Sequence, residues 1–164
     1  MTRPITDLQR TVAPFEVISD FVPAGDQPAA ITEIEKRIRN GDKNVVLVFY
    51  PFAFTPTCTG ELCAIRDEQT ALEGDDTVVF GVSCDPAPSL KAFAAAENLD
   101  YALLSDFYPH GDVSKAYGVF LEERGFATRG TFIIDKAGKI AWQVVNSPAD
   151  ARSTDDYKAA IAAL

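Results

Sequence analysis

Two continuous apolar runs constrain the fold of this chain more than any other feature of its sequence. Residues 44–50, NVVLVFY, and 77–83, TVVFGVS, consist mainly of β-branched and aromatic residues without regular polar alternation. Such runs are typical of strands that are buried on both faces. Between them, residues 57–72 carry apolar positions at helical spacing. This strand-helix-strand order predicts parallel strands in a sheet that helices cover.

The rest of the chain continues the alternation of helices and strands. Ser89 is expected to cap the next helix, and Lys136-Ala137-Gly138 to form the loop of a β-hairpin. The order predicts an α/β fold with a central mixed sheet between helices, and a thioredoxin-like sandwich fits it. The expected elements, in the order helix, strand, helix, strand, strand, helix, cover residues 89–98, 101–104, 113–119, 131–135, 139–145 and 155–164.

Composition narrows the classes of function. A chain of 164 residues with a net charge of -9 can bury a core as one domain, and its charge disfavours a nucleic-acid partner. No apolar run reaches the about 18 residues that span a bilayer, so no membrane partner is expected. The N-terminus lacks the features of a signal peptide, which favours a cytoplasmic location. Three cysteines in such a chain favour reactive thiols or metal ligands over a disulfide framework.

Cys58 is the leading candidate for a reactive thiol, because it falls in the first turn of the helix that follows the first buried strand. Backbone N–H groups there have no partner within the helix, and the helix dipole adds partial positive charge. Both effects favour the thiolate, which is the nucleophilic form of cysteine. Thr55 can supply a hydroxyl to the reacting atoms, Pro51 can shield the sulfur from water, and Arg129 can supply a guanidinium.

These residues form a pattern that resembles the peroxiredoxin family. Pro51-x-x-x-Thr55-x-x-Cys58 resembles the active-site motif of that family, and Arg129, followed by Gly130-Thr131-Phe132, resembles its active-site arginine. Two further segments match, residues 104–111 and 116–120. Together they are most similar to the alkyl hydroperoxide reductase E subgroup of actinobacteria.

The resemblance covers about residues 44–145 and implies a function. It implies a thiol peroxidase that reduces hydrogen peroxide and organic hydroperoxides without a metal or another cofactor. Cys58 would be oxidised to a sulfenic acid, in a pocket that Pro51, Thr55 and Arg129 shape. The reductant would be a thioredoxin-like protein, a mycoredoxin-like protein or a small thiol, and the enzyme would be a homodimer.

Three of the residues around Cys58 also admit a purely structural interpretation. Thr55 alone could be a helix cap, and Arg129 alone a surface charge. Glu61, one helical turn after Cys58, is similar to an acidic residue that orients the arginine in the family. The helix dipole equally favours a glutamate near the start of a helix.

Cys63 is the candidate for the thiol that resolves the sulfenic acid. On an intact helix its Cα lies roughly 8 to 9 Å from that of Cys58. A disulfide needs less than about 7 Å, so the first turns of the helix would have to unwind. The Cys-x4-Cys arrangement resembles the peroxiredoxin Q subgroup, whose second cysteine resolves the first. Alternatively, Cys63 packs as a small apolar residue, Cys84 resolves in its place, or an external thiol does.

Other chemistries fit the sequence less well. Without a Cys-x-x-Cys motif, a dithiol exchanger is disfavoured. Cys58, Cys63, Cys84 and His110 could form a zinc site by count, but two of them lie on one helix at an unsuitable spacing. We therefore expect His110 to have a structural or interface role. The alternative function is a non-catalytic thiol redox sensor or a repair-associated binding module.

The N-terminus departs from the peroxiredoxin pattern. Residues 10–43 resemble the start of an excision-repair helicase, but no Gly-x-x-x-x-Gly-Lys-Ser/Thr follows, so ATP binding is not implied. We predict an atypical strand-helix segment over residues 1–43, ahead of a peroxiredoxin domain over residues 44–164. Its helix would be capped by Asp26, with one apolar face formed by Ile31, Ile34 and Ile38.

Overall fold

The computed structural model describes residues 43–73 and 76–164. The strand and helix expected within residues 1–43 lie outside the described residues, and the domain boundary stays a prediction. The described elements are β1 (Asn44–Phe49), α2 (Pro56–Asp67), α3 (Gln69–Glu73), β2 (Thr77–Ser83), α4 (Ala87–Glu97), β3 (Ala102–Ser105), α5 (Asp112–Ala116), β4 (Phe120–Leu121), β5 (Phe126–Ala127), β6 (Arg129–Ile134), β7 (Ile140–Asn146) and α6 (Thr154–Ile161). None of the helices among these residues is long and apolar enough to cross a bilayer.

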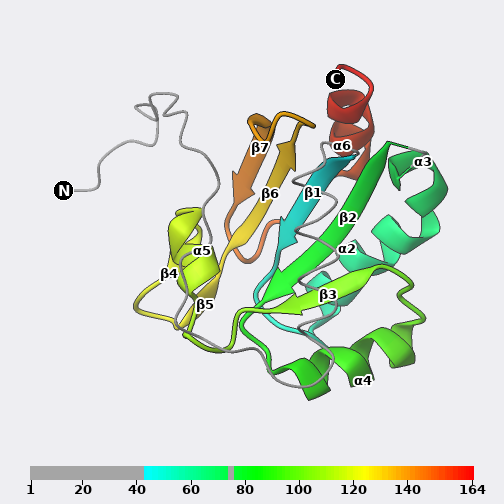
Figure 1. The fold of residues 1–164 in the computed structure, drawn as a ribbon. Helices are drawn as coiled ribbons and strands as arrows, with labels where there is room; N and C mark the ends of the chain where they lie inside the picture. The colour runs from blue at the N-terminus through cyan, green and yellow to red at the C-terminus, as the bar shows by residue number, and fades with distance from the viewer. Residues whose placement is uncertain (1–42, 74–75) are drawn as a thin grey trace.

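The central sheet has five strands in the order β3-β2-β1-β6-β7 (Figure 1). β1 and β3 both run parallel to β2, whereas β6 runs antiparallel to its neighbours β1 and β7. The predicted mixed sheet and the hairpin at its edge are therefore confirmed. Because β6 lies beside β1 and runs antiparallel to it, the first residues of β6 lie next to the last residues of β1, at the same end of the sheet.

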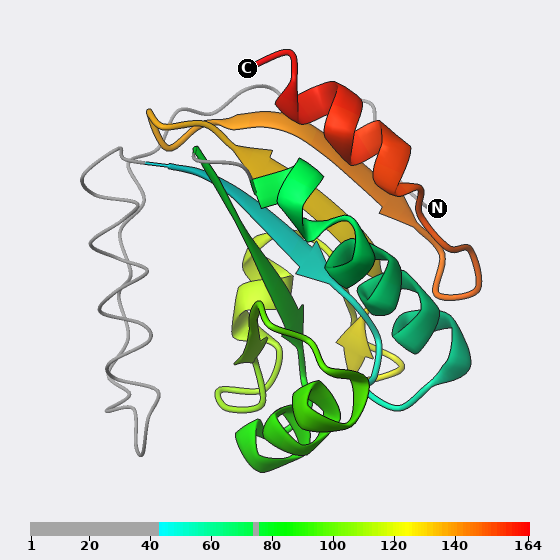
Figure 2. The same ribbon diagram turned by 90° about the vertical axis from the view of Figure 1, so that its right-hand side faces the viewer.

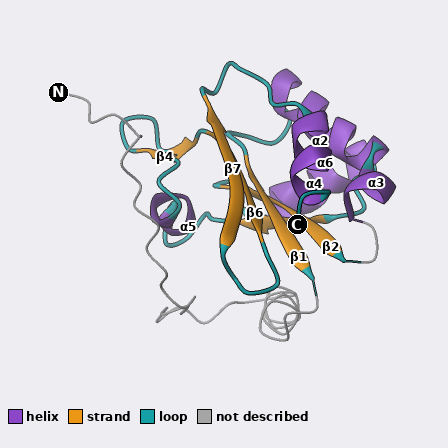
Figure 3. Cartoon of the chain, turned by 90° about the horizontal axis from the view of Figure 1, so that it is seen from above, coloured by secondary structure: helices purple, strands orange, loops and turns teal. Residues whose placement is uncertain are grey.

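Helices and loops cover both faces of the sheet. α2, α3, α4 and α6 lie on one side and α5 on the other (Figure 3). Val46 and Val48 of β1 pack in an apolar cluster on one face of the sheet, and Val45 and Phe49 pack in two smaller clusters on the other, which explains why this strand has no polar face. α6 covers β7, where the ring of Tyr157 lies 6.0 Å from that of Trp142 (Figure 2). The first core contains Val46, Val48, Cys58, Leu62, Val79, Phe93 and Ile133, and the second contains Phe49, Val82, Val119 and Phe132.

Three local expectations were wrong. The helix expected over residues 57–72 is two helices, because the backbone leaves the helical conformation at Glu68, whose carboxylate binds Lys158 of α6 at 2.8 Å. Ser89 does not cap α4, because the helix already begins at Ala87; Pro86 occupies the N-cap position, and Pro88 lies in the first turn, where prolines are favoured. The short β4–β5 hairpin was not expected, since strands of two residues leave no periodic pattern.

Gly81 is a packing position at the centre of the sheet. A β-carbon there would lie 2.6 Å from a side-chain atom of Leu103 and 3.3 Å from the ring of Tyr50. Because both neighbours are packed in the first core, we expect Gly81→Ala to lower the free energy of unfolding by about 1 to 3 kcal/mol. Gly60→Ala is the control, because nothing lies within 4 Å of its β-carbon position. Denaturant unfolding checks both variants, and a Gly81→Ala protein as stable as Gly60→Ala would contradict this view of the core.

Candidate active site

Cys58 occupies the first turn of α2, as expected. Thr55 takes the N-cap position with extended backbone angles, and its carbonyl accepts the N–H of Thr59 at 2.8 Å. The Cys58 side chain is fully buried in the first core. The sulfur is therefore buried near the start of α2, where the helix dipole places partial positive charge.

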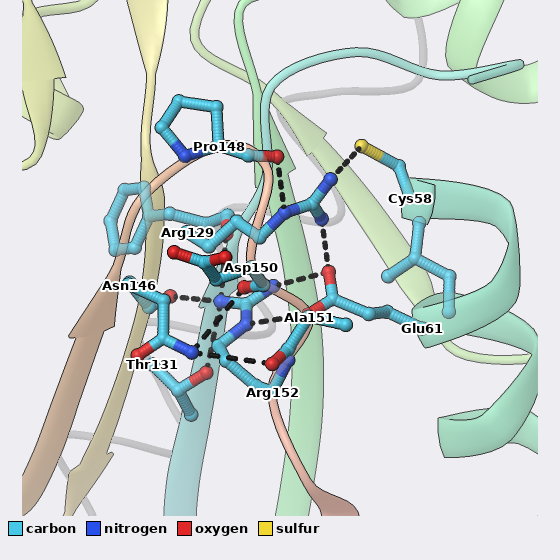
Figure 4. Close-up of polar contacts among 12 residues, drawn as sticks. Cys58, Glu61, Arg129, Thr131, Asn146, Pro148, Asp150, Ala151 and Arg152 are labelled. Carbon is cyan, nitrogen blue, oxygen red and sulfur yellow. Dashed lines mark hydrogen bonds and ion pairs between the residues drawn. The ribbon is translucent and has the colours of Figure 1, made fainter. Parts of the chain in front are cut away.

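Arg129, which is 71 residues after Cys58 in the sequence, places a positive charge beside this sulfur. It is the first residue of β6, and its Nη2 donates a hydrogen bond to Cys58 Sγ at 3.4 Å (Figure 4). The pairing of Val48 with Thr131 explains why Arg129 lies near Cys58. When this antiparallel register is continued, the start of β6 lies beside the segment that follows β1 and leads to α2. Arg129 is buried, and its Nε donates to the carbonyl of Pro148 at 2.8 Å. It is therefore not a surface charge.

Glu61 holds Arg129 in place from the next turn of α2. Its Oε2 accepts a hydrogen bond from Arg129 Nη1, and its side chain is buried. The same carboxylate accepts three hydrogen bonds from Arg152: from the backbone N–H at 2.7 Å, from Nε at 3.1 Å and from Nη2 at 3.0 Å. This geometry is the one that the family resemblance implied for Glu61.

Arg152 is a site residue that the sequence analysis missed. It lies just before α6, and its side chain is only 1% exposed. Its Nη1 donates three hydrogen bonds to residues at the end of β1 and the start of β6. The acceptors are the carbonyls of Phe49 and Gly130 and the hydroxyl of Thr131, at 2.8 to 3.0 Å (Figure 4). No local signal marks it, because an arginine ahead of a helix is usually solvent-exposed.

The loop between β7 and α6 is itself fixed. The side-chain amide of Asn146 donates to the carbonyls of Asp150 and Ala151, both at 3.3 Å. Thr128 donates to the carbonyl of Asn146 at 2.6 Å. These contacts hold the segment that supplies both the Pro148 carbonyl and Arg152 to the site (Figure 4).

The charged groups of this network lie beside the Cys58 sulfur. Within residues 43–73 and 76–164, the buried charged side chains in contact with one another here are the guanidinium groups of Arg129 and Arg152 and the carboxylate of Glu61. A buried excess of positive charge is costly unless an anion balances it. Cys58 is the remaining group of this cluster, and its sulfur is in contact with Arg129. The geometry therefore suits a nucleophilic sulfur.

Pro51 and Thr55 lie on the loop between β1 and α2. Pro51 is buried, and Thr55 is partly exposed. The Thr55 hydroxyl makes no capping bond to α2; it donates instead to the carbonyl of Phe52 at 3.1 Å. It is therefore not a hydrogen-bonding helix cap, and its oxygen keeps lone pairs available.

The two other cysteines lie in different surroundings. Cys63 is partly exposed and faces α4: its thiol donates to Glu97 Oε2 at 3.7 Å and accepts from Arg66 Nη1 at 3.6 Å. Burial raises the pKa of the Cys63 thiol, and Glu97 adds to that effect while Arg66 opposes it. Cys84 is buried after β2, and burial raises its pKa to about 11. All three cysteines are free thiols.

The structure also places the residues considered for zinc. Among the residues that it describes, no group of three or more His, Cys, Asp or Glu side chains could hold a metal ion. His110 Nε2 lies 2.8 Å from the carbonyl oxygen of Gly125, and its ring lies 5.6 Å from that of Phe120. These contacts link the loop before α5 to the β4–β5 hairpin.

A buried cysteine at a helix start, with an arginine on its sulfur and a thioredoxin-like sheet behind it, defines a thiol peroxidase of the peroxiredoxin class. The sequence model of the AhpC/TSA family matches residues 16–143, and the chain belongs to this family. The predicted fold, family and enzymatic function are confirmed.

Named relatives agree with this assignment. The chain is 45% identical over 124 residues to alkyl hydroperoxide reductase E of Mycobacterium tuberculosis (strain H37Rv), covering 76% of this chain and 81% of that protein. It is 37% identical over 131 residues to the chloroplastic 2-Cys peroxiredoxin BAS1 of Spinacia oleracea, covering 76% and 49%. These relatives favour an enzyme over the alternative of a non-catalytic sensor or repair-associated module.

Solved structures show the same fold. AhpC of Enterococcus faecalis superposes with a TM-score of 0.69 at 28% identity, covering 74% of each chain. Peroxidoxin BcpB of Mycobacterium tuberculosis superposes with a TM-score of 0.66 at 33% identity, covering 75% of this chain and 80% of that one.

Proposed function

We propose that Cys58 is the thiol that reduces the peroxide, with Arg129, Thr55 and Pro51 forming its pocket. The observation that carries this proposal is the hydrogen bond from Arg129 Nη2 to the buried Cys58 sulfur. A fixed guanidinium at this position stabilises charge on the sulfur, and it can also stabilise charge that develops on a peroxide oxygen beside it. The Thr55 hydroxyl donates its proton to the carbonyl of Phe52, so its free lone pairs can accept a hydrogen bond from the peroxide.

The proposed reaction balances as a two-electron transfer. The Cys58 sulfur attacks one peroxide oxygen, and the S–O bond forms as the O–O bond breaks. The second oxygen leaves as hydroxide or alkoxide and takes up a proton to give water or an alcohol. The sulfur is thereby oxidised to a sulfenic acid. No cofactor is needed in this step.

A thiol reductant then restores Cys58. We propose that Cys63 attacks the sulfenic acid, so that a disulfide forms and water leaves. A thioredoxin-like protein, a mycoredoxin-like protein or a small thiol would supply the two electrons that reduce the disulfide. A cytoplasmic location would provide these reductants, and the homodimer implied by the resemblance stays a prediction.

Single-turnover oxidation tests the peroxidatic role. The reduced protein is mixed with one equivalent of hydrogen peroxide in the presence of dimedone, and the modified peptide is identified by mass spectrometry. We expect rapid loss of peroxide and a dimedone adduct on Cys58. An adduct on Cys63 or Cys84 in its place, with Cys58 unmodified, would contradict the proposal.

Cys63→Ser tests the resolving step. We expect the oxidised wild-type protein to contain a Cys58–Cys63 disulfide and the oxidised Cys63→Ser variant to accumulate the sulfenic acid, because no second thiol reaches Cys58. Non-reducing peptide mapping measures both species. Cys84→Ser is the matched control and should form the wild-type disulfide, since Cys84 is buried and its pKa is raised to about 11. An intramolecular disulfide in Cys63→Ser would assign the resolving role to Cys84.

A further inference from the structure

Asp85 links the carboxyl end of β2 to the loop that carries Pro51 and Thr55. Its Oδ2 accepts a hydrogen bond from the backbone N–H of Ala53 at 2.9 Å and another from the hydroxyl of Ser83 at 2.8 Å. Asp85 lies outside the motif around Cys58 and is 32 residues away from Ala53 in the sequence. The contact therefore joins two adjacent loops of the fold at the edge of the sheet that carries the candidate site.

Asp85 is itself firmly held. Its own N–H donates to the Ser83 hydroxyl oxygen at 3.3 Å, and its carbonyl accepts from the hydroxyl of Ser105 at 2.7 Å. Ser83 ends β2 and Ser105 ends β3, and the two residues are paired in the sheet. The carboxylate thus projects from a rigid part of the sheet toward the loop after β1.

The loop needs such support, because it contains a strained residue. Phe54 has a φ of 61°, in the left-handed region that bulky side chains rarely adopt. A conformation of this kind persists only when surrounding contacts impose it. The Asp85 contact to Ala53 restrains one side of Phe54, and the ring of Phe93, 4.9 Å from the Phe54 ring, restrains the side chain itself.

The strained turn sets the direction of the Thr55 hydroxyl. Thr55 directly follows Phe54, and its Oγ1 donates to the carbonyl of Phe52 within the same turn. A rotation of the Ala53 peptide would move the Phe52 carbonyl and, with it, the hydroxyl that is to meet the peroxide. A shift of about 1 Å in a positioned group can cost about a hundredfold in rate.

We propose that Asp85 is a positioning residue for the peroxide reaction. Its carboxylate fixes the Ala53 peptide, and the loop then presents the Thr55 hydroxyl to a peroxide at Cys58. Asp85 touches neither the sulfur nor the pocket arginine, and it acts through the loop alone. This inference rests on the proposed role of Cys58.

The placement of Asp85 predicts a selective defect. The guanidinium that contacts the Cys58 sulfur belongs to Arg129, which is held by Glu61 and Pro148 rather than by Asp85. Loss of Asp85 should therefore slow the reaction with peroxide, which needs the Thr55 hydroxyl. It should leave alkylation by iodoacetamide unchanged, because alkylation needs only the thiolate.

The test compares these two rates in variants of the full chain. Asp85→Ala is expected to lower the second-order rate constant for hydrogen peroxide by about ten- to a hundredfold, with the iodoacetamide rate unchanged. Asp85→Asn keeps an oxygen that can accept the Ala53 N–H, so it should recover most of the peroxide rate. Asp135→Ala is the matched control: Asp135 also accepts backbone N–H groups, those of Ala137 and Lys139, but in the distal β6–β7 hairpin.

A double-mutant cycle checks whether Asp85 acts through Thr55. If it does, adding Asp85→Ala to Thr55→Val should slow the peroxide reaction no further. Equal peroxide rates in wild type and Asp85→Ala would overturn the inference, and so would parallel losses of peroxide and iodoacetamide reactivity. If Asp85→Ala does not fold, Asp85→Glu replaces it, because this variant keeps the charge and displaces the carboxylate by one methylene.

The outcomes separate this inference from the proposed function. A wild-type protein whose Cys58 does not react with peroxide would refute the proposed function itself. A reactive wild-type protein with equally reactive Asp85 variants would refute only the positioning role.

Discussion

Replacement of Cys58 by serine is expected to abolish peroxide consumption. A serine hydroxyl stays protonated at neutral pH and is a far weaker nucleophile than a thiol, even beside the guanidinium of Arg129. Oxygen also cannot accept the peroxide oxygen as sulfur does, so no sulfenic acid can form. The loss should therefore be complete rather than partial.

A peroxide assay with excess thiol reductant measures this loss. Cys84→Ser is the control and should turn over at the wild-type rate, because Cys84 is buried after β2 and is not part of the network. Circular dichroism and thermal unfolding show whether Cys58→Ser keeps its fold. Wild-type turnover by a folded Cys58→Ser protein would refute the proposed function.

Arg129→Met is expected to have the second-largest effect. Methionine removes the guanidinium that contacts the Cys58 sulfur while keeping an unbranched side chain of similar reach in the buried site. Loss of one preorganised donor to a reacting centre costs about a hundred- to a thousandfold in rate. Alkylation of Cys58 at neutral pH should slow as well, because the thiolate loses its balancing charge. This joint loss distinguishes Arg129 from Asp85, whose removal should affect the peroxide reaction alone.

The fold should tolerate Arg129→Met. Glu61 keeps its three hydrogen bonds from Arg152, so its buried carboxylate is not left without a cation. Arg129→Lys should remain well below wild type, because an ammonium cannot reproduce the planar set of donors that reaches Cys58, Glu61 and Pro148 together. Arg124→Met is the surface control: Arg124 is exposed and lies over the ring of Phe126. Stopped-flow oxidation compares the three variants, and a wild-type rate for Arg129→Met would rule out its role.

The buried carboxylate of Glu61 holds the charged residues of the site together. Glu61 connects both arginines to α2, and Arg152 in turn binds the carbonyls of Phe49 and Gly130, at the end of β1 and the start of β6. The helix that carries Cys58, the strand that carries Arg129 and the loop before α6 are therefore joined through charged hydrogen bonds. Such bonds are stronger than neutral ones, which suits a site whose geometry must not vary.

Local patterns in the sequence were sufficient to predict the strands and the helix start that surround the site. The apolar runs predicted β1 and β2 as strands buried on both faces, and the bounds of β2 matched residue by residue. The position of Cys58 in the first turn of α2 also followed from the chain alone, because a buried strand that stops at a proline and continues into a helical pattern leaves few alternatives. The local prediction failed at the start of α4, where Ser89 was expected to cap the helix but Pro86 occupies the N-cap position.

Only the tertiary structure decided which distant residues meet. The sequence offered Arg129 as a candidate guanidinium, which the family resemblance supported, but it contained no sign of Arg152 or of the contact between Asp85 and Ala53. Periodicity, turns and caps reflect interactions among neighbours along the chain, so they can be read locally. The meeting of Cys58 with Arg129, 71 residues later, depends on β6 lying antiparallel beside β1, and that pairing is a property of the whole sheet.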